Sequence, residues 1–167
     1  MGATGHDVCV LEVSSHALAL GRVNAFPFRV AVFTNLSHDH LDFHRDIESY
    51  FQAKLKLFSL LDKNGRAVVN ADDPYGGRIL ETLRQPALTF GFSEDAEVRA
   101  LDWTMSAAGT ELTVGTRTGE LKLYSELISL FNIQNMLAAA ATGLVLGVDR
   151  EAIINGIAAL KQVPGRL

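Results

Sequence analysis

A cluster of histidine and aspartate side chains provides the residue types in this chain that could bind a metal ion or a phosphate. The cluster follows the apolar run Val30–Thr34 and comprises His38, Asp39, His40, Asp42 and His44. The apolar run predicts a buried strand of a parallel sheet, and α/β proteins place ligands at the carboxyl end of such strands. Imidazole and carboxylate groups without paired cysteines favour a divalent cation that keeps positions open for phosphate oxygens. A set of solvated loop residues is the alternative.

A second polar group follows the apolar segment Asp7–Val13, which predicts a central strand of the same sheet. Glu12 lies near the end of this segment. Its carboxylate is either exposed at the strand end or holds Mg²⁺, as acidic residues do in nucleotide-hydrolysing α/β folds. The turn that follows contains Ser14, Ser15 and His16. Hydroxyl and N–H groups at such a turn either cap the next helix or contact a substrate.

Lys54 lies within a predicted helix, Ile47–Leu61, for which Asp46 is the expected N-cap and Asn64-Gly65 the expected stop. A solvated surface lysine is the simplest interpretation of its position. A lysine that burial keeps neutral can instead add CO₂ and form a carbamate, a carboxylate able to bind a metal ion. The local sequence leaves both interpretations open.

The composition indicates one globular domain, which we expect to lie in the cytoplasm. The 167 residues are 48% hydrophobic and 20% charged, which is not the composition of an intrinsically disordered chain. The net charge of −4 disfavours nucleic acid as the main partner. The most apolar window, Met136–Val148, is too short for a membrane span, and the first residues lack the pattern of a signal peptide. The single cysteine, Cys9, is expected to be a buried thiol outside any disulfide.

The spacing of apolar residues predicts an α/β fold with a mostly parallel sheet, flanking helices and a small antiparallel β appendage. The alternating strands and helices are expected at Asp7–Val13, Phe28–Thr34, Ile47–Leu61, Ala67–Asn70, Asp73–Arg84 and Ala87–Phe92. Antiparallel strands joined by glycine-containing turns are expected at Val98–Met105, Glu111–Arg117 and Glu120–Tyr124. Helices Asn132–Leu146 and Arg150–Leu160 follow, the second with Asp149 as N-cap. We expect residues 1–163 to form the domain and 164–167 to begin a hinge.

Many short strings of this sequence resemble the central domain of the ATP-dependent Mur ligases. The strings are Glu12–Leu18, Arg22-Val23, Phe33–Ser37, Asp39–Asp42, His44, Tyr50, Ala53-Lys54, Leu57-Phe58, Asn70–Asp73, Phe131-Asn132, Asn135 and Pro164–Arg166. Glu12–Leu18 is specific, because it resembles the members that add the third residue of the peptidoglycan stem peptide. The sister ligases carry different residues after the glutamate.

The resemblance implies a role for each matched site residue. It implies that Glu12 and His40 are Mg²⁺ ligands, and that Lys54 is carbamylated and holds a second Mg²⁺, so that these three residues are catalytic. It implies contacts to the UDP-muramoyl substrate from Ser14, Ser15, His16 and Arg22. It implies contacts to the nucleotide from Asp73, Asn132 and Asn135.

The reaction that the resemblance implies is the joining of a diamino acid to UDP-MurNAc-L-Ala-D-Glu, with ATP consumed through an acyl phosphate. We expect meso-diaminopimelate rather than L-lysine as the diamino acid. The family's phosphate-binding Gly-Lys-Thr/Ser loop has no counterpart in this sequence. We therefore expect a truncated central domain, monomeric and inactive by itself. The alternatives are a non-catalytic binding or scaffold module of the same fold and a ligase like folylpolyglutamate synthase.

Overall fold

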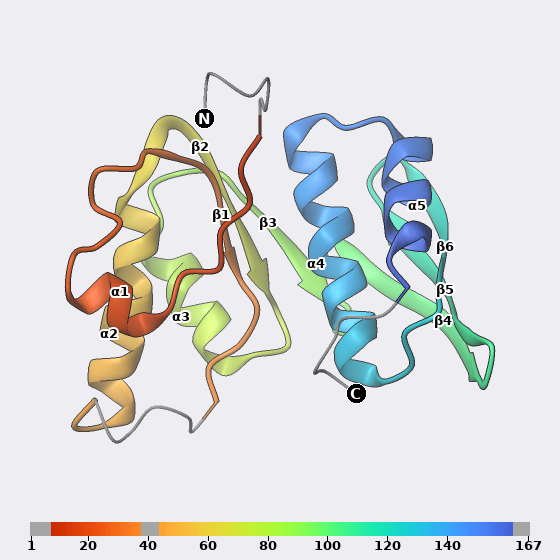
Figure 1. The fold of residues 1–167 in the computed structure, drawn as a ribbon, viewed down its shortest axis with the longest axis horizontal. Helices are drawn as coiled ribbons and strands as arrows, with labels where there is room; N and C mark the ends of the chain where they lie inside the picture. The colour runs from red at the N-terminus through yellow and green to blue at the C-terminus, as the bar shows by residue number, and fades with distance from the viewer. Residues whose placement is uncertain (1–7, 38–43, 162–167) are drawn as a thin grey trace. The chain divides into compact units, whose positions relative to one another are not determined.

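The computed structural model of the protein, drawn in Figure 1, describes residues 8–37 and 44–161. Its chain divides into two compact units. The first unit contains two helices, α1 (Ser15–Ala19) and α2 (Ile47–Ser59). The second unit contains the whole β-sheet together with α3 (Pro74–Thr82), α4 (Leu130–Leu146) and α5 (Arg150–Ala159). No helix in the described ranges is long and apolar enough to cross a membrane.

The sheet of the second unit is parallel in one half and antiparallel in the other. Its strands are β1 (Phe28–Phe33), β2 (Leu61–Asn70), β3 (Ala87–Gly91), β4 (Val98–Ser106), β5 (Gly109–Thr116) and β6 (Gly119–Ser125). They lie in the order β1-β2-β3-β4-β5-β6, with parallel pairing from β1 to β4 and antiparallel pairing from β4 to β6. This arrangement confirms the predicted fold class.

Helix α4 packs across the sheet, and its burial forms the main core of the second unit. It contacts β1 to β5, while α5 lies beside it and packs on β6 (Figure 1). Small residues on α4, Ala138, Ala140 and Ala141, are buried and let the helix lie close to the strands. The strands contribute fully buried residues that include Val68, Phe90 and Val114. Removal of this apolar surface from water is the main force that holds α4 on the sheet.

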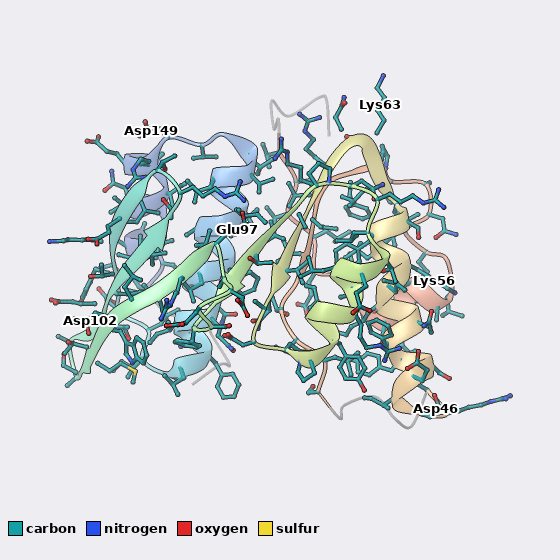
Figure 2. The ribbon with its side chains drawn as sticks, turned by 180° about the vertical axis from the view of Figure 1, so that it is seen from behind. Asp46, Lys56, Lys63, Glu97, Asp102 and Asp149 are labelled. Carbon is teal, nitrogen blue, oxygen red and sulfur yellow. The ribbon has the colours of Figure 1, made fainter. Side chains whose placement is uncertain are left out.

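The predicted caps of α2 and α5 are confirmed. Asp46 lies at the start of α2 and Asp149 at the start of α5 (Figure 2), and their carboxylates accept the backbone N–H groups of Ser49 and Glu151. Each satisfies a donor that the first helical turn leaves unpaired. Hydrogen bonds from the backbone and then the side chain of Ser49 hold the pKa of the Asp46 carboxyl below its usual value.

The predicted strand at Asp7–Val13 is wrong for the part that the structure describes. Residues 8–13 have no strand pairing, and Val10 is 94% exposed. Cys9, predicted to be buried, is exposed for the same reason. An apolar run shows that a segment favours burial, but a strand also needs a neighbouring backbone with which to exchange hydrogen bonds.

The predicted helix stop at Asn64-Gly65 is also wrong, because α2 ends at Ser59 and these residues lie inside β2. They form an irregularity in the pairing of β1 with β2, where Phe28 pairs with Leu61 but Val30 pairs with Arg66. The carboxylate of Asp62 accepts the N–H of Asn64 there. The Asn64-Gly65 pair was thus correctly identified as a break in regular structure, but it produces a bulge in a strand instead of the end of a helix. The hinge at Pro164–Arg166 and the boundary at 163 lie outside the described residues.

Candidate functional site

The carboxyl ends of three neighbouring parallel strands in the second unit are joined by the side chains of Asn70 to Asp73. Asn70 ends β2 and is 2% exposed. Its side-chain amide donates to the carbonyl of Thr34, just after β1, at 2.7 Å, and its Oδ1 accepts the N–H of Asp72 at 2.9 Å. Asn70 thus ties β1 to its own turn and leaves neither end of its amide unpaired.

The two aspartates that follow Asn70 extend this connection. The Asp72 carboxylate accepts the N–H groups of Phe92 and Ser93, which follow β3, at 2.9–3.0 Å. Asp73 is the N-cap of α3, with Oδ1 accepting from Tyr75 at 2.8 Å and Oδ2 accepting from Leu36 at 2.9 Å. Both Asp73 oxygens are therefore engaged by backbone donors of this unit. We call residues 70–73 the polar clamp.

Two glycines let the polar clamp close. A Cβ on Gly76 would lie 2.0 Å from the carbonyl oxygen of Asn70, so only glycine allows α3 to begin this close to the end of β2. A Cβ on Gly91 would lie 2.6 Å from Asp72 Oδ1, so glycine also makes room for the aspartate beside β3. No role was predicted for either glycine from the sequence, although Gly76 closes the turn Asp73-Pro74-Tyr75-Gly76 by donating its N–H to the Asp73 carbonyl.

In the first unit, the ring of His44 lies beside Ser15, His16 and Tyr50, and Lys54 lies beside Tyr50 in turn. The His44 ring lies 2.9 Å, through Nε2, from Ser15 Oγ, and both side chains are buried. The same ring is stacked on Tyr50 with a centroid distance of 5.1 Å and lies 5.8 Å from the ring of His16. Lys54 Nζ lies 5.2 Å from the centre of the Tyr50 ring. No role was predicted for Tyr50 from the sequence, although its spacing of four residues from Lys54 places both on one helix face.

The other predicted site residues of the first unit face solvent to different degrees. Glu12, Ser14 and Arg22 are exposed, whereas His16 and Lys54 are half-buried. Ser14 Oγ accepts the N–H of Ala17 and caps α1, so the capping interpretation of Ser14 is confirmed. Lys54 is not the fully solvated lysine of the simplest interpretation, because it packs over an aromatic ring. A capping hydroxyl, an imidazole and a guanidinium are groups that can bind an anionic sugar nucleotide.

The start of α4 presents amides and an exposed aromatic ring. Ser129 caps the helix, Asn132 donates to the carbonyl of Ile128, and Asn135 donates to Asn132. Phe131 is 75% exposed and lies four residues before Asn135, so the two share one helix face. An aromatic ring beside an amide can stack on and hydrogen-bond a flat heterocycle such as a nucleobase.

The predicted metal ligands are Glu12, His40 and Lys54. His40 lies outside the described residues, and Glu12 and Lys54 both belong to the first unit. Among residues 8–37 and 44–161, no three His, Cys, Asp or Glu side chains are grouped as a metal site. A glutamate oxygen and an imidazole nitrogen are both groups that can bind a divalent cation.

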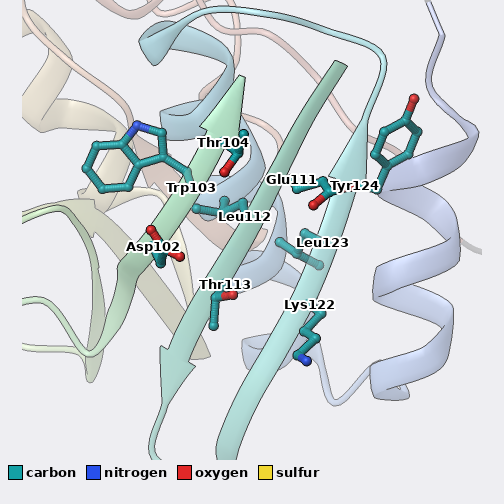
Figure 3. A pocket seen from close by; sticks show the side chains of 9 residues that line it. All are labelled: Asp102, Trp103, Thr104, Glu111, Leu112, Thr113, Lys122, Leu123 and Tyr124. Carbon is teal, nitrogen blue, oxygen red and sulfur yellow. The ribbon is translucent and has the colours of Figure 1, made fainter. Parts of the chain in front are cut away.

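An open hollow of about 450 Å³ lies elsewhere, on the antiparallel strands β4 to β6 (Figure 3). It is lined by Asp102, Trp103, Thr104, Glu111, Leu112, Thr113, Lys122, Leu123 and Tyr124. None of these residues was predicted to carry chemistry. The hollow lies on the β appendage, and none of the predicted site residues lines it.

Comparison with known proteins gives one family. The model of the Mur ligase middle domain matches residues 1–143. The UDP-N-acetylmuramoyl-L-alanyl-D-glutamate–2,6-diaminopimelate ligase of Gloeobacter violaceus is 48% identical over 167 residues, covering 100% of this chain and 34% of that protein. The chain spans about a third of the length of the curated relatives that it matches.

Solved structures agree with this match. A structure of a UDP-N-acetylmuramoyl-L-alanyl-D-glutamate–2,6-diaminopimelate ligase has a TM-score of 0.82 and 31% identity, over 92% of this chain and 32% of that one. The MurF ligase of Thermotoga maritima in complex with ADP has a TM-score of 0.75, over 92% of this chain and 35% of that one. Its identity of 24% supports a shared fold alone.

Proposed function

The chain belongs to the Mur ligase family, and we propose that it supplies part of the catalytic centre of an ATP-dependent acid–amino-acid ligase of peptidoglycan synthesis. The observation that supports this most is the 48% identity to a 2,6-diaminopimelate-adding ligase along the whole of this chain. The likeness to a solved ligase of the same name, at a TM-score of 0.82, supports it further.

The proposed substrates are UDP-MurNAc-L-Ala-D-Glu, ATP and a diamino acid, which we take to be meso-diaminopimelate rather than L-lysine. In the proposed reaction, a carboxylate oxygen of the D-glutamate attacks the γ-phosphorus of ATP, and ADP leaves. The amine of the diamino acid then attacks the acyl phosphate carbon, phosphate leaves with the bonding electrons, and the amine loses a proton. An amide, ADP and phosphate result. The principal barrier is the approach of two anions, which positive groups must offset.

We assign the muramoyl substrate to the first unit. Arg22 is exposed and can pair with an anionic group. Ser14, the N-cap of α1, and His16, within α1, can donate hydrogen bonds. Ser15 is buried against His44, so its contribution is to hold α1 in place instead of contacting the substrate. Because the chain has a net charge of −4, an anionic ligand needs a local positive group, and Arg22 can provide it.

We assign the adenine to the start of α4. Asn135 and Asn132 supply amide groups, and Phe131 supplies an exposed ring on the same face as Asn135. Asp73 belongs to the proposed nucleotide site as well. Because both of its oxygens accept backbone N–H groups, we propose that it shapes the loop after β1 instead of binding the nucleotide through a free carboxylate.

We propose Glu12, His40 and a carbamylated Lys54 as the residues that hold Mg²⁺. Bound Mg²⁺ would neutralise phosphate charge. Glu12 is exposed, Lys54 is half-buried, and both belong to the first unit. We also propose that the protein is a cytoplasmic monomer. We propose that this 167-residue chain alone does not turn over, because its sequence contains no Gly-Lys-Thr/Ser loop.

Calorimetric titration of UDP-MurNAc-L-Ala-D-Glu into the chain, with Mg²⁺ present, tests the proposed function. We expect saturable binding that UMP does not reproduce and that Arg22→Ala weakens at least about tenfold, the loss of a charge-assisted hydrogen bond. Arg45→Ala, which removes another exposed arginine of the same unit, is the matched control and should bind like the wild type. Binding that both variants retain would contradict the assignment of the muramoyl site. No binding by a folded chain would favour a scaffold module.

A further inference from the structure

We infer that His44 is a positioning residue: it holds helix α1, with Ser14 and His16, against helix α2, which carries Lys54. This inference deepens the proposed function and rests on it for its consequence for substrate binding. The evidence for the positioning itself is independent of any ligand. It consists of contacts among Ser15, His44 and Tyr50.

The pairing of His44 with Ser15 is buried, which makes it a strong constraint on position. Ser15 is 3% exposed and His44 is 6% exposed, and their Oγ and Nε2 atoms are 2.9 Å apart. A buried hydroxyl that loses its partner pays the cost of desolvation without a hydrogen bond in return. The position of Ser15 relative to His44 is therefore fixed more tightly than an exposed contact would fix it.

Helix α1 depends on such a constraint because it is short. It has five residues, Ser15–Ala19, and a helix of this length is not stable by itself in water. Its backbone bonds, Leu18 to the Ser14 carbonyl and Leu20 to the His16 carbonyl, form only while the turn is held in place. Ser15 is the first residue of the helix, so its side chain anchors the end that carries Ser14 and His16.

His44 also contacts α2, the helix that carries Lys54. Its ring is stacked on Tyr50, with an angle of 18° between the ring planes, and Tyr50 is 4% exposed. Lys54 Nζ lies over the same Tyr50 ring, one helical turn further along α2. His44 is thereby in contact with both the anchor of the proposed substrate turn and the residue that packs beneath the proposed catalytic lysine.

Amide hydrogen exchange on variants of the full 167-residue chain tests this inference without a ligand. His44→Phe keeps a ring against Tyr50 but removes the nitrogen that faces Ser15, and Ser15→Ala removes the other partner with little change in volume. We expect the amides of Leu18, Leu20 and Arg22 to exchange about tenfold faster in both, as loss of one buried hydrogen bond predicts. His44→Gln, which retains an N–H donor, should restore slow exchange in part.

The outcomes separate a positioning role from general packing. Unchanged exchange in α1 of Ser15→Ala, a variant that should remain folded, would overturn the inference. Equal acceleration in α4 of the second unit would overturn it too, because that would report a global loss of stability. Lys56→Ala, which alters an exposed side chain of α2, is the matched control and should leave the ratio of α1 to α4 exchange at its wild-type value.

A second readout connects the inference to the proposed function. The dissociation constant for UDP-MurNAc-L-Ala-D-Glu should rise about tenfold in His44→Phe and stay within about twofold of wild type in Lys56→Ala. A wild-type chain that does not bind would fail the proposed function, while the exchange rates would still decide the positioning role. Binding unaffected by His44→Phe, together with faster α1 exchange, would overturn the claim that the position of α1 controls the substrate site.

Discussion

The polar clamp at residues 70–73 and the turn at residues 12–16 have similar residue types but use them in different ways. In the polar clamp, Asn70, Asp72 and Asp73 all direct their side chains to backbone groups at the ends of β1, β3 and α3. In the turn, Glu12 and Ser14 are exposed, and only Ser15 is buried in a side-chain pair. The first motif maintains the fold, whereas the second has exposed side chains, for which we propose ligand binding.

The difference shows that a match to a family motif does not by itself identify a ligand contact. Asp73 matched the family as readily as Glu12 did, yet both of its oxygens accept backbone donors. A carboxylate whose acceptors are satisfied within the fold has less to offer a ligand. Substitutions in the two motifs should accordingly divide into those that change stability and those that change binding.

The largest expected effect is that of Gly76→Ala, which should destabilise the polar clamp. The added Cβ would lie 2.0 Å from the Asn70 carbonyl oxygen, so α3 or β2 must shift. We expect a loss of about 3 kcal/mol in the free energy of unfolding, measured by chemical denaturation. Gly77→Ala is the matched control, because its Cβ would meet nothing within 4 Å and alanine favours the helix. Equal effects of the two would contradict the close approach at Gly76.

Asn70→Ala should have the next largest effect, about 2 kcal/mol, because it leaves the Thr34 carbonyl and the Asp72 N–H without their partner. The measurement is again the unfolding free energy from denaturant titration. Asn64→Ala, at an exposed asparagine in the β2 irregularity, should change it by less than about 0.5 kcal/mol. If Asn70→Ala costs no more than Asn64→Ala, the polar clamp does not hold these strands.

Asp73→Asn tests whether Asp73, which matches the family motif, has a structural role or binds the nucleotide. Asparagine can still cap α3 but loses one of two acceptors, so stability should fall by about 1 kcal/mol. Affinity for ADP, followed by fluorescence of a labelled nucleotide, should stay within about twofold of wild type. A tenfold weaker affinity with unchanged stability would mean that the carboxylate binds the nucleotide directly.

The smallest effect is expected in acid, at the start of α2. The pKa of Asp46 lies below 3.8 in the folded chain, so this carboxylate adds stability at pH values above 3.8, and the contribution is lost as the pH falls through the lowered pKa. Asp46→Asn keeps a capping acceptor but does not ionise in this range. Its unfolding free energy should fall less steeply with acid than that of the wild type. Parallel pH profiles would contradict the assignment.

The sequence predicted the elements of this fold where their signals were local. The caps at Asp46 and Asp149, the antiparallel hairpins and the parallel strands from Phe28 onward follow from apolar spacing and turn chemistry. Residues 8–13 failed because strand formation depends on a partner backbone, which apolar spacing does not reveal. Glu12, His40 and the Ser14–His16 turn were candidates from their residue types and positions, and the family resemblance assigned a role to each. The local sequence left two interpretations of Lys54 open.

The contacts that these site residues make could not be predicted from the sequence. Ser15 pairs with His44 across 29 positions of sequence, and no periodicity links a serine on one helix to a histidine before another. The polar clamp likewise joins Asn70 to Thr34 and Asp72 to Ser93. Tyr50 was the exception, because its spacing of four from Lys54 was visible from the sequence and was given no weight.

The most direct test of the difference between the two motifs is a ¹H–¹⁵N correlation spectrum of the chain titrated with UDP-MurNAc-L-Ala-D-Glu and Mg²⁺. The amides of residues 13–22 should shift progressively and saturate, while those of the polar clamp and of the hollow on β4 to β6 should move little. Shifts confined to the hollow or to residues 70–73, with residues 13–22 unmoved, would contradict the assignment of the substrate to the α1 turn.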